Sequence, residues 1–316
     1  MSRSDTIRVK VDGITTLSPS LKKFTLTPAD AAMLPPAGAG AHVMLLLSGG
    51  TRVWRNAYSL VSPPGERRSY DIIVRQTADS RGGSAFLHTQ VRHGDVLRLT
   101  PPVNTFPLPK LAGRHLLLGG GIGMTPFLPW LAVLRARRTP FELHQFCRPD
   151  DVAACHALLA PSAGERITIH TRRDALDLPD VLSKQSLDTH LSFCGPPGFM
   201  DHVSELARAL GWPAAKLHRE SFGGAAHGDP FQVTLARSGL VLDVPEDRSL
   251  LDVLEDAGVD APYLCRGGAC GQCRVPVLAG VPAHNDHVLT QDERARGDAM
   301  LTCVSRAQTA SLVLDI

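Results

Sequence analysis

The sequence predicts a mixed fold of three consecutive parts: an antiparallel β-barrel, a parallel α/β sheet and a compact C-terminal α+β module. Short strands of alternating hydrophobicity, separated by Gly and Pro clusters, fill residues 7–100. From about residue 113, apolar strands alternate with helical stretches, which is typical of a parallel sheet. Strands, a helix and a cysteine-rich loop follow. The predicted domains are residues 1–110, 111–226 and 227–316.

The length and composition of the chain limit the number of domains and the class of protein. A chain of 316 residues is too long for one ordinary core and fits two or three domains. Its 43% hydrophobic and 20% charged residues indicate a soluble globular protein, and a formal charge of +2 gives no basic field for nucleic acid. We expect no signal peptide and no membrane partner, because no apolar run reaches the ~18 residues of a spanning helix. Self-contained domains favour a monomer.

The first part contains clear strand signals. Residues 7–11 and 24–26 alternate between apolar and polar side chains, as do Tyr70–Arg75, less strictly, and Val96–Leu99. Gly and Pro clusters lie between them, and a helix is expected from Ser84 to Val91. These features predict a small antiparallel barrel.

The second part begins with a short apolar run at residues 115–118, which looks like a strand buried on both faces. A glycine run follows, and Thr125 and Pro126 predict a helix start with a capping hydroxyl and a first-turn proline. Further strands at 141–146, 167–170 and 191–193 alternate with helical stretches at 151–159 and 198–210. This alternation predicts a parallel α/β domain, which a small flexible linker at 223–230 ends.

The third part opens with strands at 231–235 and 241–244. Ser249 can cap a helix that runs to about Ala257, and residues 311–316 form a closing strand. Between them lies the cysteine-rich loop. This order is consistent with a compact ferredoxin-like module.

Four cysteines have a diagnostic spacing. Cys265, Cys270 and Cys273 form C-x4-C-x2-C, and Cys303 stands far downstream, as in plant-type [2Fe–2S] proteins. The small residues Gly267, Gly268 and Gly271 suit such a loop, since only small residues let backbone N–H groups turn inward towards the sulfides of a cluster. A structural zinc site and disulfides are the alternatives, but zinc favours paired knuckles and the fourth cysteine stands alone.

The other three cysteines are an odd number, which argues against a disulfide framework and indicates a reducing, cytoplasmic compartment. They are Cys147, Cys155 and Cys194.

The glycine run at 119–123 does not match the Rossmann fingerprint, whose last glycine falls on Met124 or Pro126 in the two possible registers. A glycine-rich turn between a strand and a helix still presents N–H groups to a diphosphate. A second loop, residues 194–200, follows another predicted parallel strand and should reach the same crevice. A tight turn without a ligand remains the alternative.

Two stretches of the barrel suit a flat redox ring with a phosphate. Tyr58 can lie against such a ring while Ser59 offers a hydrogen bond near its nitrogens. Arg81, Gly82 and Gly83, at the start of the predicted helix, can hold a phosphate. Taken singly, a packed tyrosine and a solvated arginine–glycine turn are the plainer interpretations.

The chain is predicted to have a barrel, an α/β domain and a C-terminal cysteine module in this order. This order resembles that of the phthalate dioxygenase reductase family, which includes the vanillate demethylase reductases. The resemblance covers essentially the whole chain. It implies a flavin-binding barrel, a nucleotide-binding domain of ferredoxin-reductase type and a plant-type ferredoxin domain of β-grasp fold. It also implies that FMN is held by Arg55, Asn56, Ala57, Tyr58, Ser59, Ile73, Val74, Arg75, Arg81, Gly82, Gly83, Ser84, Thr125 and Phe222. It assigns NAD(P)H to Gly120, Gly121, Ile122, Gly123, Met124, Arg148, Cys194, Gly195, Pro196 and Pro197, and the cluster to Cys265, Cys270, Cys273 and Cys303.

One position departs from the pattern of related flavoproteins, which commonly show Arg-x-Tyr-Ser. Asn56 occupies the arginine position here and Arg55 precedes it, so Arg55 should point to the opposite face of the strand. Arg81 would then hold the phosphate largely alone, and the choice of FMN over FAD rests on the resemblance.

The nucleotide is expected to be NADH. Arg172 and Arg173 could take the 2′-phosphate of NADPH, but the adjacent Asp174 reduces their positive charge.

The implied function is a reductase that passes electrons from NADH through FMN to a [2Fe–2S] cluster and on to a terminal Rieske non-haem iron oxygenase of aromatic catabolism. The cofactors carry the chemistry, so no catalytic His or Asp is assigned. A similar reductase serving a cytochrome P450 or another oxygenase is the alternative. A redox-sensing binding protein is a further one.

Overall fold

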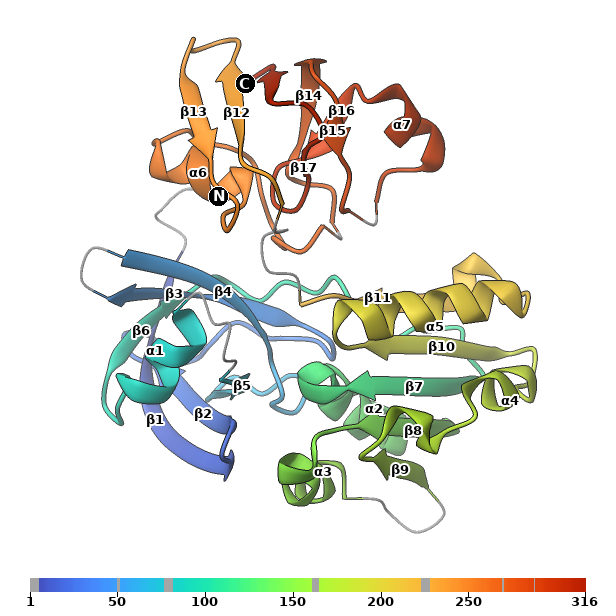
Figure 1. Ribbon diagram of the computed structural model, residues 1–316. Coiled ribbons are helices and arrows are strands. Elements are labelled where there is room, and N and C mark those ends of the chain that lie inside the picture. The colour runs from blue at the N-terminus through green and yellow to red at the C-terminus, as the bar shows by residue number, and fades with distance from the viewer. Residues whose placement is uncertain are drawn as a thin grey trace. The chain divides into compact units, whose positions relative to one another are not determined.

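The structure is a computed structural model that describes residues 6–49, 52–76, 82–160, 165–222, 228–268, 270–286 and 288–316. The chain divides between Ser221 and Phe222 into two compact units. The first unit contains the barrel and the parallel sheet, and the second contains the C-terminal module (Figure 1). The domain boundaries at residues 110 and 226 remain predictions. No helix among the described residues is long and apolar enough to cross a membrane.

A six-stranded antiparallel sheet in the order β4-β3-β6-β1-β2-β5 forms the predicted barrel. Its elements are β1 (Ile7–Ser18), β2 (Leu21–Pro28), β3 (His42–Gly49), β4 (Arg52–Ser59), β5 (Tyr70–Arg75), α1 (Gly83–Thr89) and β6 (Val96–Leu99). A bridge between Leu60 and Ile72 joins the two outer strands, and the Val61 N–H donates to the Asp71 carbonyl over 2.8 Å. These contacts close the sheet on itself.

Alternating side chains fill the barrel. Val9 and Val11 of β1 are fully buried while their neighbours Arg8 and Lys10 are exposed. Every second residue on β2, β3 and β5 also points inward, because successive side chains of a strand face opposite sides. The alternation that predicted strands is therefore the property that builds this core.

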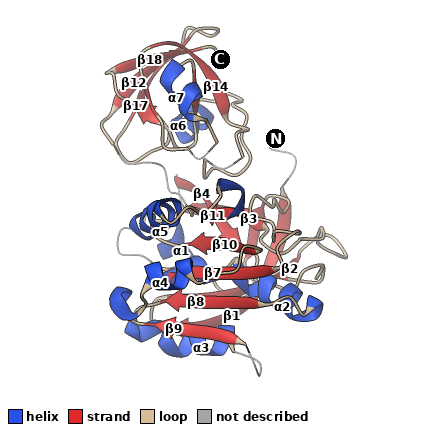
Figure 2. Cartoon of the chain, turned by 90° about the vertical axis from the view of Figure 1, so that its right-hand side faces the viewer, coloured by secondary structure: helices blue, strands red, loops and turns tan. Residues whose placement is uncertain are grey.

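The second sheet is parallel throughout and has the order β11-β10-β7-β8-β9 (Figure 2). Its strands are β7 (Arg114–Gly120), β8 (Phe141–Phe146), β9 (Arg166–His170), β10 (Thr189–Cys194) and β11 (Leu217–Glu220). The α-helices are α2 (Phe127–Arg137), α3 (Val152–Leu159), α4 (Leu178–Ser183) and α5 (Pro197–Ala209). Four 3₁₀ turns accompany them, η1 (Gly121–Met124), η2 (Pro149–Asp151), η3 (Arg173–Ala175) and η4 (Ala214–Lys216).

Helices cover both faces of this sheet. Leu117 and Leu143 pack against α2 and α3, whereas Leu116 and Leu118 pack against α4 and α5. Successive residues of β7 thus enter different cores, which explains why the strand reads as an unbroken apolar run. The α/β prediction is confirmed.

The start of α2 differs from the prediction. Its N-cap is Pro126, and no side chain caps it. Thr125 has helical backbone angles, and its hydroxyl donates to the Ile122 carbonyl over 3.0 Å because η1 and α2 run almost continuously.

The barrel and the parallel sheet share one core. Leu21 of β2 and Ile73 of β5 are buried with Met124, Phe127 and other residues of the parallel domain. Phe106, in the connection between the two parts, stacks on Trp130 with ring centroids 4.7 Å apart. The two parts therefore form a single packed body.

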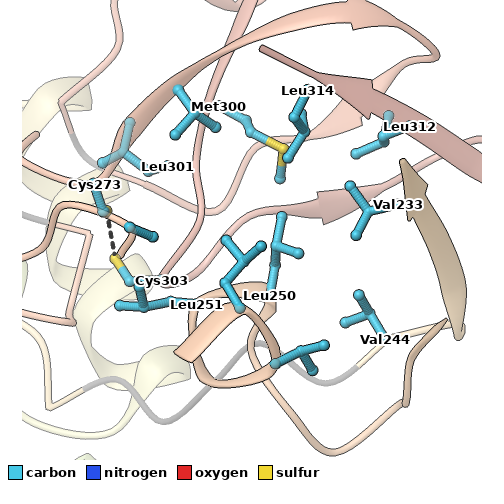
Figure 3. Close-up of a cluster of buried hydrophobic side chains, with 14 of the residues drawn as sticks. Val233, Val244, Leu250, Leu251, Cys273, Met300, Leu301, Cys303, Leu312 and Leu314 are labelled. Atoms are coloured by element: carbon cyan, nitrogen blue, oxygen red, sulfur yellow. Dashed lines mark hydrogen bonds between the residues drawn. The ribbon is translucent and has the colours of Figure 1, made fainter. Parts of the chain in front are cut away.

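The second unit has a mixed five-stranded sheet in the order β13-β12-β18-β14-β16, in which β12 and β18 run parallel. Its elements are β12 (Phe231–Leu235), β13 (Val241–Val244), α6 (Leu250–Asp256), β14 (Arg274–Ala279), β15 (Pro282–Ala283), α7 (Gln291–Arg296), β16 (Ala299–Leu301), β17 (Arg306–Ala307) and β18 (Ser311–Leu314). Leu250 and Leu251 of α6 pack against the apolar face of the sheet (Figure 3).

Both helices of this unit carry side-chain caps. Ser249 accepts a hydrogen bond from the Asp252 N–H over 3.0 Å, which confirms the predicted cap of α6. Thr290 and Glu293 form a reciprocal capping box at α7. The sequence analysis predicted no helix there.

We predict that Ser249→Ala destabilises α6 by about 1 kcal/mol, because one N–H of its first turn loses its acceptor. Amide hydrogen exchange should show weaker protection at the start of α6, while Ser249→Thr, which keeps the hydroxyl, should restore most of it. Unchanged protection in the alanine variant would show that the cap is dispensable.

Candidate functional site

The four predicted cluster cysteines come together in two pairs in the second unit. The Sγ atoms of Cys273 and Cys303 lie 3.1 Å apart (Figure 3), and the thiols of Cys265 and Cys270 hydrogen-bond to each other. Among the described residues, no three His, Cys, Asp or Glu side chains converge on a point that could hold one metal ion. Two thiol pairs suit a cluster in which each of two irons takes two cysteines, so this donor set fits a [2Fe–2S] centre.

Backbone conformation shapes the cysteine loop. Gly268 and Gly271 have φ values of 69° and 75°, in the left-handed region that favours glycine. A Cβ atom on Gly268 would also stand 2.7 Å from the Val304 side chain. The Gly267 N–H donates to the Cys265 Sγ over 3.4 Å. The loop therefore turns the Gly267 N–H towards a cysteine sulfur, and the contacts of its N–H groups to cluster sulfides remain a prediction.

Arg266 ties this loop to α6. Its guanidinium is almost buried, donates to Asp252 over 3.0 Å, pairs with Glu255 and lies 4.1 Å from the centre of the Tyr263 ring. A buried cation held by two carboxylates on one helix fixes the residue after the first cysteine. The sequence analysis did not single out Arg266.

The two loops proposed for the nucleotide meet in the first unit. The chain continues from β7 to β8 on one side and places β10 on the other, so the strand order reverses between β7 and β10. Ligands of open α/β sheets bind at the carboxyl ends of strands at such a reversal. A Cβ atom on Gly123 would stand 2.1 Å from the Cys194 carbonyl oxygen, and one on Gly120 would stand 3.0 Å from Pro196. Only glycine allows this approach.

The remaining predicted nucleotide residues surround this contact. Gly121, Ile122 and Met124 complete η1, while Gly195 and Pro197 lie at the start of α5. Arg148 is exposed, just after β8.

A buried glutamine that the sequence analysis missed supports the glycine turn. Gln145 of β8 is fully buried, and its Nε2 donates to the Gly121 carbonyl over 2.9 Å. Its side-chain oxygen leaves no room for a side chain on Gly119. The sequence signal that could have identified Gln145 is a polar residue within a strand that is otherwise buried.

Cys194 and Glu220 lie on neighbouring strands beneath the same edge. Cys194 is fully buried, and both its burial and the nearby Glu220 carboxylate raise the pKa of its thiol. This cysteine is therefore a neutral thiol rather than a thiolate nucleophile.

The predicted flavin residues on β4 divide between its two faces. Asn56 and Tyr58 face the barrel side, where the Asn56 Nδ2 donates to the Tyr58 hydroxyl over 3.3 Å and burial raises the tyrosine pKa to about 12. The Asn56 side chain packs against Gly83 at the start of α1. Arg55 pairs with Leu46 in the register and so lies on the opposite face, together with Ala57.

Ser59 and α1 provide the test of whether a flavin fits here. Ser59 is 4% exposed, and its Oγ has no hydrogen-bond partner among the described residues. A buried hydroxyl without a partner is costly, and a bound ligand with a polar ring could supply that partner. No side chain caps α1 at Gly82, and its first turn, which contains Ser84, carries no acidic residue. Both features suit an anionic ligand with a polar ring.

The barrel reaches the glycine turn through β5. Ile73 packs in the same core as Met124, while Val74 packs inside the barrel. The Arg75 Nη2 lies 4.0 Å from the position of a Cβ atom on Gly121. The predicted flavin strand and the predicted nucleotide turn are thus direct neighbours, and Thr125 lies buried just beyond the turn.

Two predicted flavin residues cannot be placed against this surface. Arg81 lies outside the described residues. Phe222 is the first residue of the second unit and is 37% exposed.

Arg172 and Asp174 form an exposed bidentate ion pair after β9. The Arg172 Nε donates to Asp174 over 2.9 Å, and its Nη2 contacts the second carboxylate oxygen. One of the two arginines considered for a 2′-phosphate is therefore already paired.

Comparison with known proteins agrees with this arrangement. The model of the 2Fe-2S iron-sulfur cluster binding domain family matches residues 233–308. The chain is 43% identical to the heme-dependent oxidative N-demethylase beta subunit of Ectopseudomonas mendocina (strain ymp), over 99% of this chain and 100% of the relative. It is 41% identical to the vanillate O-demethylase oxidoreductase of Pseudomonas putida, over 93% of this chain and 94% of that protein.

A solved structure is similar along nearly the whole length. This is phthalate dioxygenase reductase, described as a modular structure for electron transfer from pyridine nucleotides to [2Fe-2S], with a TM-score of 0.81, 35% identity and 98% of both chains covered. The chain therefore is an oxidoreductase of the family that includes phthalate dioxygenase reductase and vanillate O-demethylase oxidoreductase.

Proposed function

We propose that this protein oxidises NADH and delivers the electrons, through FMN and a [2Fe–2S] cluster, to a terminal oxygenase component. The observation that carries the proposal is the contact between the barrel strand β5 and the glycine turn η1. A flavin on the barrel and a nicotinamide on the turn would meet at this junction.

The flavin would be held by residues of three segments. Tyr58 and Ser59 would contact the ring, while Asn56 and the start of α1 at Gly83 would receive the phosphate. Arg55 lies on the face of β4 opposite Asn56, whose side chain packs against Gly83 at the start of α1, so we infer that Arg81 is the principal cation for the phosphate.

NADH would lie along η1 and the loop after β10. The backbone contact between Gly123 and Cys194 supports this placement, because both loops then present main-chain N–H groups at one edge. The exposed guanidinium of Arg148 would bind a phosphate group.

When bound, NADH supplies a hydride, FMN accepts two electrons and releases them one at a time, and the [2Fe–2S] cluster transfers single electrons. The chain positions them and excludes water. The neutral, buried Cys194 places no charge beside the nicotinamide site. We place the reaction in the cytoplasm, where NADH is available, and expect a monomer.

The electron acceptor is the part of the proposal that depends on the relatives. Resemblance to the phthalate and vanillate systems favours a Rieske oxygenase. The relative from Ectopseudomonas mendocina is named as a subunit of a heme-dependent N-demethylase, so a heme-containing partner is a second candidate. The tagged reductase can be used to capture its partner protein from the native host. The absorbance or EPR spectrum of the captured partner, with either a Rieske signal or a heme Soret band, distinguishes the two candidates.

An anaerobic titration with NADH tests the whole route. Flavin absorbance should bleach, a rhombic signal of the reduced cluster should appear at low temperature, and heat should release FMN. A cluster signal with dithionite but never with NADH would refute the proposal.

We predict that Cys273→Ser abolishes electron transfer to the partner but leaves reduction of ferricyanide by NADH largely intact, because the cluster loses one of its four thiols. Cys155→Ala, a buried thiol in the core of the parallel domain, is the control and should retain both activities. Equal loss of both activities in Cys273→Ser would contradict a stepwise route.

We predict that Asp174→Asn raises the ratio of kcat/KM for NADPH to kcat/KM for NADH by roughly tenfold, because the freed Arg172 can bind a 2′-phosphate. Asp180→Asn removes another exposed ion pair of this domain, to Lys184, and should leave the ratio unchanged. A constant ratio in Asp174→Asn would remove Arg172 from nucleotide discrimination.

We predict opposite effects of Ser59→Ala on the flavin-free and the flavin-loaded protein. Without flavin, stability should be unchanged or rise by about 1 kcal/mol, since a buried hydroxyl without a partner disappears, and FMN affinity should fall by roughly tenfold. Ser62→Ala is the control, because its Oγ accepts a hydrogen bond from the Asp71 N–H over 2.6 Å and its loss should destabilise both forms. Fluorescence titration and thermal unfolding measure these effects.

A further inference from the structure

A buried ion pair between Arg75 and Asp151 joins the barrel to the parallel domain. The Arg75 Nη2 at the end of β5 donates to the Asp151 Oδ2 at the end of η2 over 2.8 Å. The side chains are 11% and 1% exposed. Arg75 belongs to the barrel and Asp151 to the parallel domain, so the ion pair is a contact between these two parts of the first unit.

Two serines from the β1–β2 turn complete the pair. The Ser18 Oγ donates to the Asp151 Oδ1 over 2.5 Å, and the Ser20 Oγ donates to the same oxygen over 3.2 Å. Burial alone would raise the pKa of Asp151, but the hydrogen bonds from Ser18 and Arg75 outweigh it and lower the pKa below its usual range. The carboxylate is therefore charged and held from the barrel at both of its oxygens.

Each end of the pair continues into a segment that the proposed function uses. Arg75 directly follows Ile73 and Val74 on the proposed flavin strand. The Asp151 N–H donates to the Arg148 carbonyl over 3.0 Å, which closes the turn that carries the proposed phosphate ligand. The Arg75 headgroup also lies beside Gly121 of the glycine turn.

We propose that Arg75 and Asp151 are positioning residues for hydride transfer, which fix the distance between the flavin on the barrel and the nicotinamide on the glycine turn. This inference rests on the proposed function. The pair acts through β5, the β8–α3 turn and η1 rather than by contact with the reacting atoms. Its loss should lower the rate of hydride transfer more than it weakens the binding of either cofactor.

The reason for this separation of effects is geometric. The flavin contacts proposed on β4 and α1 lie on the barrel and the nucleotide contacts lie on the parallel domain, so these contacts keep their own residues when the link between the two parts loosens. Hydride transfer needs both rings in one arrangement, and a displacement of about 1 Å can cost on the order of a hundredfold in rate.

A partly buried ion pair within the parallel domain provides the control. Arg135 of α2 donates to Glu165 through two hydrogen bonds of 2.8 Å, and both residues belong to the parallel domain. Glu165→Gln therefore weakens a well-formed ion pair without loosening the link to the barrel.

The test uses the flavin-loaded, full-length protein under anaerobic conditions. Stopped-flow absorbance follows flavin bleaching by NADH in the wild type, Asp151→Asn and Glu165→Gln, with flavin content and thermal stability measured on the same samples. We expect Asp151→Asn to lower the limiting rate by about tenfold or more, with an NADH Kd within about threefold of the wild type and full flavin content. An enlarged isotope effect with NADH deuterated at the transferred position should accompany this loss.

The results of this experiment test the positioning role and the proposed function separately. A wild-type flavin that NADH does not reduce would refute the proposed function. A normal limiting rate in Asp151→Asn, or an equal loss in Glu165→Gln at the same drop in Tm, would refute only the positioning role. If Asp151→Asn does not fold, Ser18→Ala, which removes one hydrogen bond to the carboxylate, takes its place with a smaller expected loss of rate.

Discussion

The double packing of β5 is the constraint on which the first unit depends. Val74 enters the core of the barrel, whereas its neighbour Ile73 enters the core of the parallel domain with Met124. Because adjacent residues of a strand face opposite sides, one strand can serve two cores only if both parts lie against it at the same time. The barrel and the glycine turn are consequently held in one arrangement, which an electron-transfer protein needs between its two cofactor sites.

The same junction buries the Asp151 carboxylate, which must therefore be paired. A buried carboxylate is tolerated only when it is paired and hydrogen-bonded, and removal of one partner of such a pair typically costs about 3–5 kcal/mol. Asp151 receives hydrogen bonds from Arg75, Ser18 and Ser20. Apolar packing determines which surfaces of the two parts meet, and the ion pair between Arg75 and Asp151 fixes how these surfaces are aligned. Gly120 and Gly123 have no room for side chains, and they hold the glycine turn against the loop after β10 within the parallel domain.

Much of this could be predicted from sequence because the signals are local. Tyr70–Arg75, Val96–Leu99 and Phe141–Phe146 were predicted with the bounds that the structure has, and the [2Fe–2S] cofactor predicted from the cysteine spacing is confirmed by the match to the 2Fe-2S domain family. Asp151 could not be recognised, since its partner Ser18 lies 133 residues away and an acidic residue after a strand usually caps a helix. The helix α7 was missed because its charged sequence resembles a solvated loop, although Thr290 and Glu293 carried the capping signal.

The second unit applies the same principle to its metal loop. Arg266 has a φ of 53°, a conformation that costs a residue with a side chain about 1 kcal/mol or more. Glycine would remove this cost, but it would also remove the guanidinium that Asp252 and Glu255 hold against α6. The strained backbone is therefore maintained by a buried ion pair, and the position of Cys265 depends on a helix as well as on the cluster. In both units, charged side chains from distant elements locate the loops that we propose as cofactor sites.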